Sequence, residues 1–355
     1  MKPKIWIKSP SFDLLWFIAP MAIPPLIVFF LPEHFTNQQK TEIFPWSWIL
    51  IVLSIDVAHV YTTVYKTYFK PSAFKIHKLK LLAVPFIVWI VGVLIHSISG
   101  KLFWSLLAYF AVFHFIRQQY GFFRLYSKRE TLHKGRKWIL SVTIYAVTVI
   151  PILIWHVRGQ QNFNWLTAGD FWYINLPKLE PVLNGMMILI LLLYLIVEWK
   201  EKQDSGYLNT PRILLTLSTC FSYYVSIVLT NNDFIFSLVN VVGHGIPYLA
   251  LVYFSEKKEL REDSPTLLKL VLSKWGWILF YGIVFAFAYF EETLWDVFIW
   301  RENTIPFGWL YSTFQQLNDE QIISLFVPLL IMPQVVHYIL DGYIWRKKDY
   351  QILQQ

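Results

Sequence analysis

The stretch LKLLAVPFIVWIVGVLIHS, residues 79–97, decides the class of fold. Its only Lys, Arg, Asp or Glu residue is Lys80, at the beginning, and almost all of the rest is apolar. A helix rises about 1.5 Å per residue, so about 20 apolar residues cover the roughly 30 Å hydrocarbon core of a bilayer. The stretch therefore predicts a helix that spans a membrane.

Segments of this kind recur along the whole chain of 355 residues, of which 56% are hydrophobic and 15% charged. A soluble domain usually carries about 25% charged residues. The composition therefore predicts an all-α fold, a polytopic integral membrane bundle that forms a single transmembrane helical domain over 1–355. We expect about ten spans, at 12–31, 46–68, 79–97, 103–125, 137–156, 182–199, 211–230, 234–254, 275–291 and 321–345.

The basic residues predict the orientation of these spans. Of the 31 Lys and Arg, all but five fall at one end of the predicted helices or in the loops there. Basic residues accumulate on the cytoplasmic side, so both termini are expected to be cytoplasmic, in a bacterial inner membrane. The net charge of +8 is then explained by basic cytoplasmic loops that face anionic membrane lipids, and this excludes a nucleic-acid partner. The five exceptions are Lys40, Lys101, Arg158, Lys178 and Arg301.

Two long outer loops, near 157–181 and 291–320, are rich in aromatic residues such as Trp172 and Trp309. They are expected to form interfacial helices, a lid, or ordinary aromatic-belt loops. The only cysteine, Cys220, excludes an internal disulfide and a site built from several thiolates.

Four histidines lie inside predicted spans, one in each of the second, fourth, eighth and tenth. These spans all run from outside to inside, and each histidine lies in the middle or the cytoplasmic half. Ionisable groups in hydrocarbon are costly and usually face the bundle interior for a functional reason. We therefore expect His59, His114, His244 and His337 to hold one metal ion.

Each histidine has a polar neighbour three or four residues away, on the same helix face. These neighbours are Asp56, Gln118, Asn240 and Asp341. A metal-bound histidine usually gives its other ring N–H to such a group, so they are expected to orient the imidazoles or to act as additional ligands. Asp341 could instead cap the membrane edge.

Imidazole and carboxylate ligands without nearby thiolates suit Fe(II) best, and zinc or manganese are possible. Four residues close to the histidines are expected to line a pocket for a hydrophobic small molecule, although belt placement and helix packing explain them equally well. They are Tyr61, Gly243, Gly245 and Tyr248. No catalytic residue can be assigned from the sequence, and neither can the oligomeric state.

One histidine per helix in a polytopic chain resembles the Brp/Blh family of membrane β-carotene dioxygenases. The stretch FHFIRQQ, residues 113–119, is similar to that family's H-x-x-x-H helix, with Gln118 where its second histidine stands. The resemblance implies a histidine-held ferrous centre that cleaves a carotenoid with oxygen.

The sequence leaves two main classes of function open, and a structural protein without catalytic activity is a third alternative. The first is a metal-dependent oxygenase or oxidoreductase, with non-haem iron, acting on a lipid or isoprenoid. The second is a proton- or ion-coupled transporter that uses the intramembrane His and Asp residues as a relay.

Overall fold

The computed structural model describes residues 5–32, 45–128, 133–162, 164–260 and 264–345. These residues form helices and loops, with one isolated bridge between Arg158 and Asn175 and no strand among them. The all-α prediction is confirmed. The chain forms two compact units: unit 1 comprises Met1–Ile43 and Ala108–Pro247, and unit 2 comprises Phe44–Leu107 and Tyr248–Gln355. Two helices, α8 (Gly100–Tyr126) and α13 (Val242–Glu259), run from one unit into the other.

Helices occupy all ten predicted spans, and within the described residues nine of them are long and apolar enough to cross a membrane. The chain thus has the helices of a multi-pass membrane protein. The remaining predicted span, 103–125, lies in α8, which has 27 residues and is therefore about 40 Å long, but is less apolar. The nine are Pro10–Val28, Pro45–Lys66, Pro71–Ile98, Lys134–Val157, Pro177–Ser205, Thr210–Leu229, Asp233–Glu259, Trp277–Trp300 and Glu320–Ile344. The orientation of the spans stays a prediction, and Lys40 lies outside the described residues.

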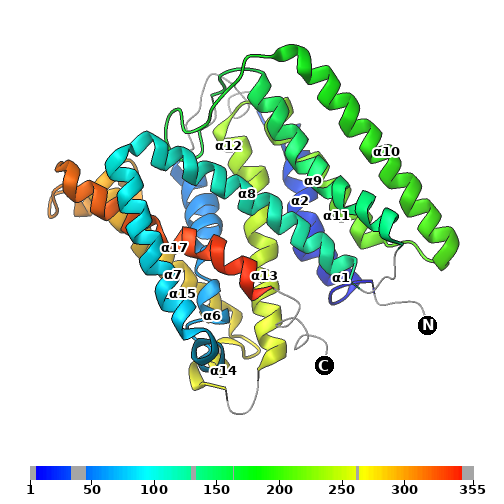
Figure 1. The fold of residues 1–355 in the computed structure, drawn as a ribbon. Helices are drawn as coiled ribbons and strands as arrows, with labels where there is room; N and C mark the ends of the chain where they lie inside the picture. The colour runs from blue at the N-terminus through cyan, green and yellow to red at the C-terminus, as the bar shows by residue number, and fades with distance from the viewer. Residues whose placement is uncertain (1–4, 33–44, 129–132, 163, 261–263, 346–355) are drawn as a thin grey trace. The chain divides into compact units, whose positions relative to one another are not determined.

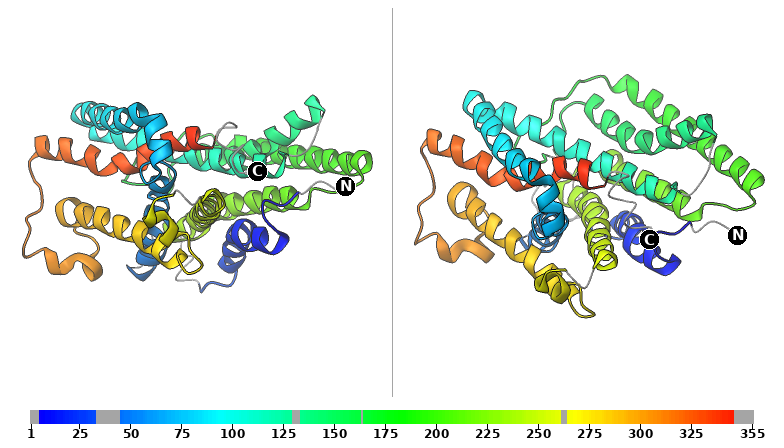
Figure 2. Two further views of the ribbon diagram at one scale, coloured as in Figure 1. Left: turned by 90° about the horizontal axis from the view of Figure 1, so that it is seen from below. Right: turned by 60° about the horizontal axis from the view of Figure 1, so that its bottom comes forward.

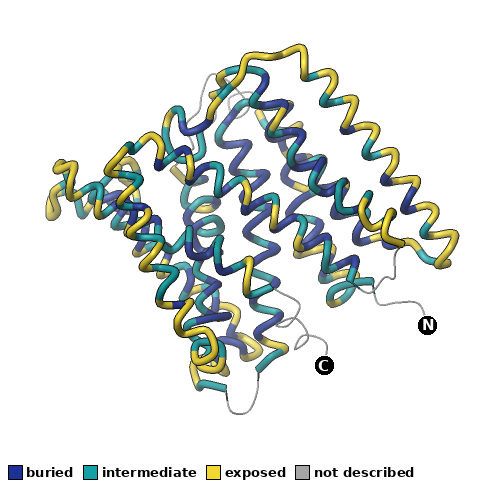
Figure 3. The backbone as a smooth tube through the Cα atoms, viewed as in Figure 1, coloured by how far each residue is buried: buried dark blue, intermediate teal, exposed yellow. Residues whose placement is uncertain are grey.

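Unit 1 is built around α11 and its neighbours. Here α9 and α10 run side by side, and α2 packs against α11 (Figures 1 and 2). Exposed residues follow α10 along its length, and Ile188 and Leu192 are among them, as on a helix that faces lipid (Figure 3). Its elements are α1 (Pro10–Asp13), η1 (Leu14–Ile18), α2 (Ala19–Val28), α9 (Lys134–Val157), η3 (Pro177–Leu179), α10 (Glu180–Ser205), α11 (Thr210–Tyr223), η4 (Tyr224–Leu229), α12 (Asp233–Phe236) and η5 (Ser237–Val241).

A buried ion pair ties α10 to α11. Arg212 donates from Nε and Nη2 to the two carboxylate oxygens of Glu198, at 2.7 Å each. Both side chains are buried. The paired geometry satisfies charges that would be very costly alone in an apolar interior.

In the outer loop of unit 1, the described residues 158–162 and 164–176 form no helix, so the interfacial-helix expectation fails for them. Phe171 is buried in a cluster with Trp155 and Tyr223, so this loop packs against the helices of its own unit, and a role as a lid stays a prediction. The carboxylate of Asp170 organises it by accepting the backbone N–H groups of residues 165–167. Burial raises the pKa of Asp170 above 3.8, although these N–H groups act in the opposite direction.

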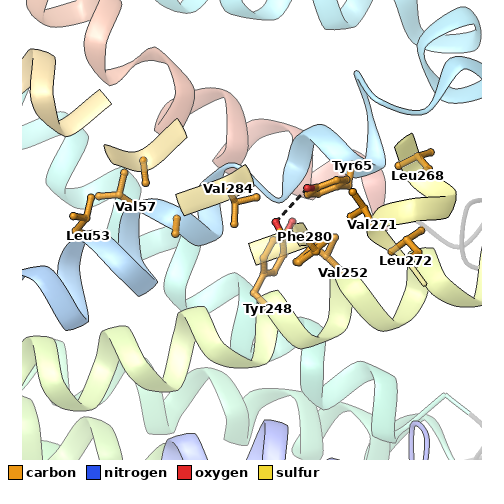
Figure 4. Close-up of a cluster of buried hydrophobic side chains, with 12 residues drawn as sticks. Leu53, Val57, Tyr65, Tyr248, Val252, Leu268, Val271, Leu272, Phe280 and Val284 are labelled. Atoms are coloured by element: carbon orange, nitrogen blue, oxygen red, sulfur yellow. Dashed lines mark hydrogen bonds between the residues drawn. The ribbon is translucent and has the colours of Figure 1, made fainter. Parts of the chain in front are cut away.

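Unit 2 pairs α7 with α17, and its apolar core gathers Tyr65, Val252 and Phe280 (Figure 4). The Tyr65 hydroxyl donates to the Phe280 carbonyl at 3.2 Å. Its elements are α4 (Pro45–Ser47), η2 (Trp48–Val57), α5 (Ala58–Val60), α6 (Thr63–Lys66), α7 (Pro71–Ile98), α14 (Thr266–Val271), α15 (Trp277–Trp295), η6 (Asp296–Trp300), α16 (Thr304–Phe307), η7 (Gly308–Leu310) and α17 (Glu320–Ile344).

The ninth span differs from its predicted end at residue 291. The helix continues through η6 to Trp300. Beyond it, Asp296 accepts the backbone N–H groups of Glu302 and Asn303 and fixes the turn that follows. The extra turns bring Glu292 and Asp296 inside a membrane-length helix, and Glu291 no longer lies at its end.

Candidate functional site: two buried histidine pairs

Unit 1 brings His114 and His244 together. His114 lies on α8 and His244 on α13, and both side chains are buried. Their ring centroids are 5.0 Å apart and the rings are nearly perpendicular, at 75°. The ring of Phe115 stacks on His244, with centroids 3.7 Å apart at an interplanar angle of 6°. The pair is therefore packed in an aromatic environment.

The two amides predicted to orient this pair, those of Gln118 and Asn240, do not hydrogen-bond to the histidines. Asn240 donates from Nδ2 to Ser226 Oγ at 2.7 Å and to the Phe236 carbonyl at 3.2 Å, rather than to His244. Gln118 is buried, and its amide makes no hydrogen bond within the described part of the chain. The structure therefore gives neither amide a hydrogen bond to a histidine, and a role for them as metal ligands stays a prediction.

Unit 2 brings His59 and His337 together in a similar way. The ring centroids are 5.1 Å apart at an interplanar angle of 84°, and both rings are buried. Nδ1 of His59 hydrogen-bonds to the Ile55 carbonyl at 3.1 Å. Nδ1 of His337 lies 2.7 Å from the Thr63 hydroxyl. Since both Nδ1 atoms are engaged, Nε2 is the atom of each ring that would hold a metal.

The carboxylates stand near these rings but do not bond to them. Asp341 Oδ1 is 3.8 Å from His337 Nδ1, and Asp56 Oδ1 is 4.0 Å from His59 Nδ1, both too long for a hydrogen bond. Asp341 instead accepts the hydroxyl of Tyr248. Thr63 takes the place that the sequence assigned to Asp341. Thr63 lies at the beginning of α6, four residues after His59, and is a hydroxyl near a histidine that the sequence also shows.

Irregular helix geometry precedes one histidine of each pair. The π-helical segment η2 ends two residues before His59, and η5 ends three residues before His244. Such segments are rare and occur often at functional sites. Both histidines thus follow a locally widened turn of helix.

The predicted pocket residues separate into two groups. Tyr248 lies edge-on to both imidazoles of unit 2, and Tyr61 donates its hydroxyl to Glu291 at 2.6 Å. Gly243 serves helix packing, because a Cβ there would collide with Met21 of α2. Gly245 lies beside His244 in α13, and a pocket role for it stays a prediction.

Glu291 is the most conspicuous buried acid that sequence reasoning missed. Besides Tyr61, the Trp295 indole and the Gln334 amide each donate to its Oε1 at 3.4 Å. The side chain is buried in a helix of membrane length. The predicted span ended at this residue, whereas the helix continues to Trp300.

No family model, curated protein or solved structure matches this chain. The likeness to carotene dioxygenases therefore stays an expectation, and the geometry of the two pairs carries the functional argument.

The ring spacing fits imidazoles that share an ion. A ring nitrogen about 2.0–2.1 Å from a metal puts the ring centroid about 3.2 Å from it, so two such rings at tetrahedral or octahedral angles have centroids about 4.5–5.3 Å apart. Both pairs fall in that range, at 5.0 and 5.1 Å. Edge-to-face packing of aromatic rings produces similar spacings, so a metal measurement has to decide. The two pairs belong to different units, and a single ion held by all four histidines stays a prediction.

Proposed function

We propose that this protein is a membrane-embedded metal enzyme, an iron-dependent oxygenase or oxidoreductase acting on a lipid or isoprenoid. The observation that carries the proposal is the pair of buried imidazoles in each unit, spaced as ligands of one ion are. The donors are imidazoles with carboxylates in reach and no thiolate among them, a set that suits Fe(II). Bound ferrous iron with open positions would supply the activation of oxygen.

The residues of the chain would divide the remaining tasks. The Ile55 carbonyl and the Thr63 hydroxyl hold the imidazoles of unit 2 in orientation. Buried apolar surroundings exclude water and admit a hydrophobic substrate from the bilayer. Asp56 and Asp341, near but not bonded to the rings, can balance the charge of a dication.

The test is the metal content of protein purified in mild detergent and loaded anaerobically with Fe(II). We expect bound iron to be lost in His59→Ala/His337→Ala and in His114→Ala/His244→Ala. His96→Ala is the matched control, because His96 also lies in a membrane helix but hydrogen-bonds to Ser324 at 3.0 Å. Absence of iron from the wild type, or equal loss in the control, would refute the proposal. The number of ions per chain tests the predicted single centre.

A proton-coupled carrier is the second candidate, favoured by Glu291. A buried carboxyl group held by donors from three directions is what an intramembrane proton site requires. In proteoliposomes with a pH-sensitive dye inside, proton flux that is lost in Glu291→Gln and persists after metal removal would favour this function.

A further inference from the structure

One arginine of unit 1 lies on the exposed surface of a long helix. Arg117 belongs to α8, and it is exposed rather than turned into the bundle. At a rise of about 1.5 Å per residue, its Cα lies about 14 Å from the end of α8 at Tyr126, inside the predicted span 103–125. A charged side chain at such a depth usually has a partner that offsets its charge.

The partners that the structure gives to Arg117 are two tyrosines. Nη1 of Arg117 donates to the Tyr145 hydroxyl on α9, and the guanidinium lies over the ring of Tyr120, 5.2 Å from its centroid. The two tyrosine rings stack on each other, with centroids 4.9 Å apart. Among the described residues no carboxylate pairs with Arg117. The tyrosines therefore hold the guanidinium in place, and its positive charge is left for another partner.

Arg117 and Tyr145 offer further hydrogen-bond donors on this surface. A guanidinium carries several N–H donors, and the described residues use one of them. The Tyr145 hydroxyl accepts that hydrogen bond and keeps its own proton to donate. One turn further along α8, a Cβ on Gly121 would meet no atom within 4 Å, so the helix surface there is open. Arg124 follows on the same face of the helix and adds a second positive charge.

We propose that Arg117, Tyr145 and Arg124 bind the phosphate headgroup of a lipid. Phosphate oxygens match the paired N–H donors of a guanidinium, and they accept the Tyr145 hydroxyl as well. A headgroup lies nearer to the membrane surface than its chain. The chain therefore runs from Arg117 towards Phe113, which is 55% exposed, and passes the level of His114. The phosphate belongs to a bilayer phospholipid or to a polyprenyl phosphate, and a role as anchor of the substrate rests on the proposed function.

The experiment measures lipid binding to delipidated, metal-free protein in mild detergent by native mass spectrometry. The ligands are farnesyl phosphate, dioleoyl phosphatidic acid, and farnesol, which has the farnesyl chain without the phosphate. We expect the wild type to bind both phosphates and Arg117→Lys to bind them about tenfold more weakly. The reason is that lysine keeps the charge but loses the paired donors. Farnesol binding should be the same in both proteins.

Two further variants separate this site from general attraction between charges. Lys202→Gln removes an exposed positive charge from α10, which is outside the site, and should leave phosphate binding unchanged. Gly121→Leu places a side chain on the open helix surface, where its Cβ meets no atom, and should weaken binding of both phosphates in a folded protein. Equal phosphate affinities of the wild type and Arg117→Lys, or an equal loss in Lys202→Gln, would overturn the proposal.

The two phosphates identify the source of the ligand. A preference for phosphatidic acid indicates a bilayer lipid and a preference for farnesyl phosphate an isoprenoid, and both outcomes support the site. Because the protein is free of metal, these results are independent of iron binding. A chain that binds phosphates through Arg117 but never iron would refute the proposed enzyme and keep this site.

Discussion

The two histidine pairs have almost the same geometry but different surroundings. The rings are 5.0 Å apart in unit 1 and 5.1 Å apart in unit 2, nearly perpendicular in both. In unit 1 the Phe115 ring stacks on His244, and the polar residues one helical turn from the histidines are the neutral amides Gln118 and Asn240. In unit 2 they are a hydroxyl and carboxylates, those of Thr63, Asp56 and Asp341.

Equal ring spacing therefore does not give the two pairs equal chemistry. A dication bound by the pair of unit 2 would have the carboxylates of that unit within reach, whereas the ring contacts of His244 within unit 1 are with His114 and Phe115. We therefore expect unit 2 to dominate metal affinity and unit 1 to dominate contact with the apolar substrate.

The largest expected effect comes from the buried charges. Glu198→Gln leaves Arg212 buried without its anion, and should destabilise unit 1 by about 3–5 kcal/mol. Unit 2 groups its charges differently, because Lys66 and Lys70 contact both Glu256 and Glu259. Glu259→Gln should cost much less, since both lysines keep Glu256. Unfolding in mixed detergent micelles measures both, and equal losses would contradict this contrast.

The second effect concerns the hydrogen bonds that orient the ligands. Thr63→Val removes the partner of His337 Nδ1 and should lower iron affinity about 10–100-fold. Gln118→Leu in unit 1 removes an amide without a hydrogen bond in the described chain, and should change iron affinity little. Competition with a chelator measures the affinities. If Gln118→Leu has the larger effect, Gln118 is a metal ligand and the contrast between the units is wrong.

The third effect compares two glycines. In unit 2 a Cβ on Gly92 would lie 2.8 Å from Cβ of Pro328 in α17, a rigid neighbour. In unit 1 a Cβ on Gly243 would meet the end of the flexible Met21 side chain. Gly92→Ala should cost about 1–3 kcal/mol, as overpacking does, and Gly243→Ala less. Thermal unfolding of the two variants gives the order, and a reversed order would show that Met21 cannot move.

The smallest effect is a pH dependence confined to unit 1. Burial raises the pKa of Asp170 in the folded state above the ordinary value of 3.8. At pH values between 3.8 and this raised pKa, the folded chain therefore binds more protons than the unfolded chain. Stability should therefore fall as the pH rises from 3.8 through the folded pKa. Asp170→Asn, which cannot ionise, should remove this fall in unfolding curves recorded against pH. An unchanged pH profile would show that Asp170 does not contribute to it.

The positions of helices could be predicted well because apolar length is a local property. The predicted 79–97 lies inside α7, and 182–199 lies inside α10. Local sequence patterns did not predict burial where the hydrogen-bond partner of a polar residue lies far away in the sequence. Glu291 looked like the end of a span, yet the hydroxyl of Tyr61, far away in sequence, allows it to be buried.

An all-α fold of membrane-length helices and the four buried histidines could be predicted from the sequence, because apolar runs and the ionisable residues within them can be read residue by residue. The three-dimensional structure was needed to show which histidines lie together and that Thr63 rather than Asp341 hydrogen-bonds to His337. The physical reason is that hydrogen bonds and ring contacts depend on atoms a few ångströms apart. Helix rotation and π-helical turns set those distances, and neither follows from hydropathy.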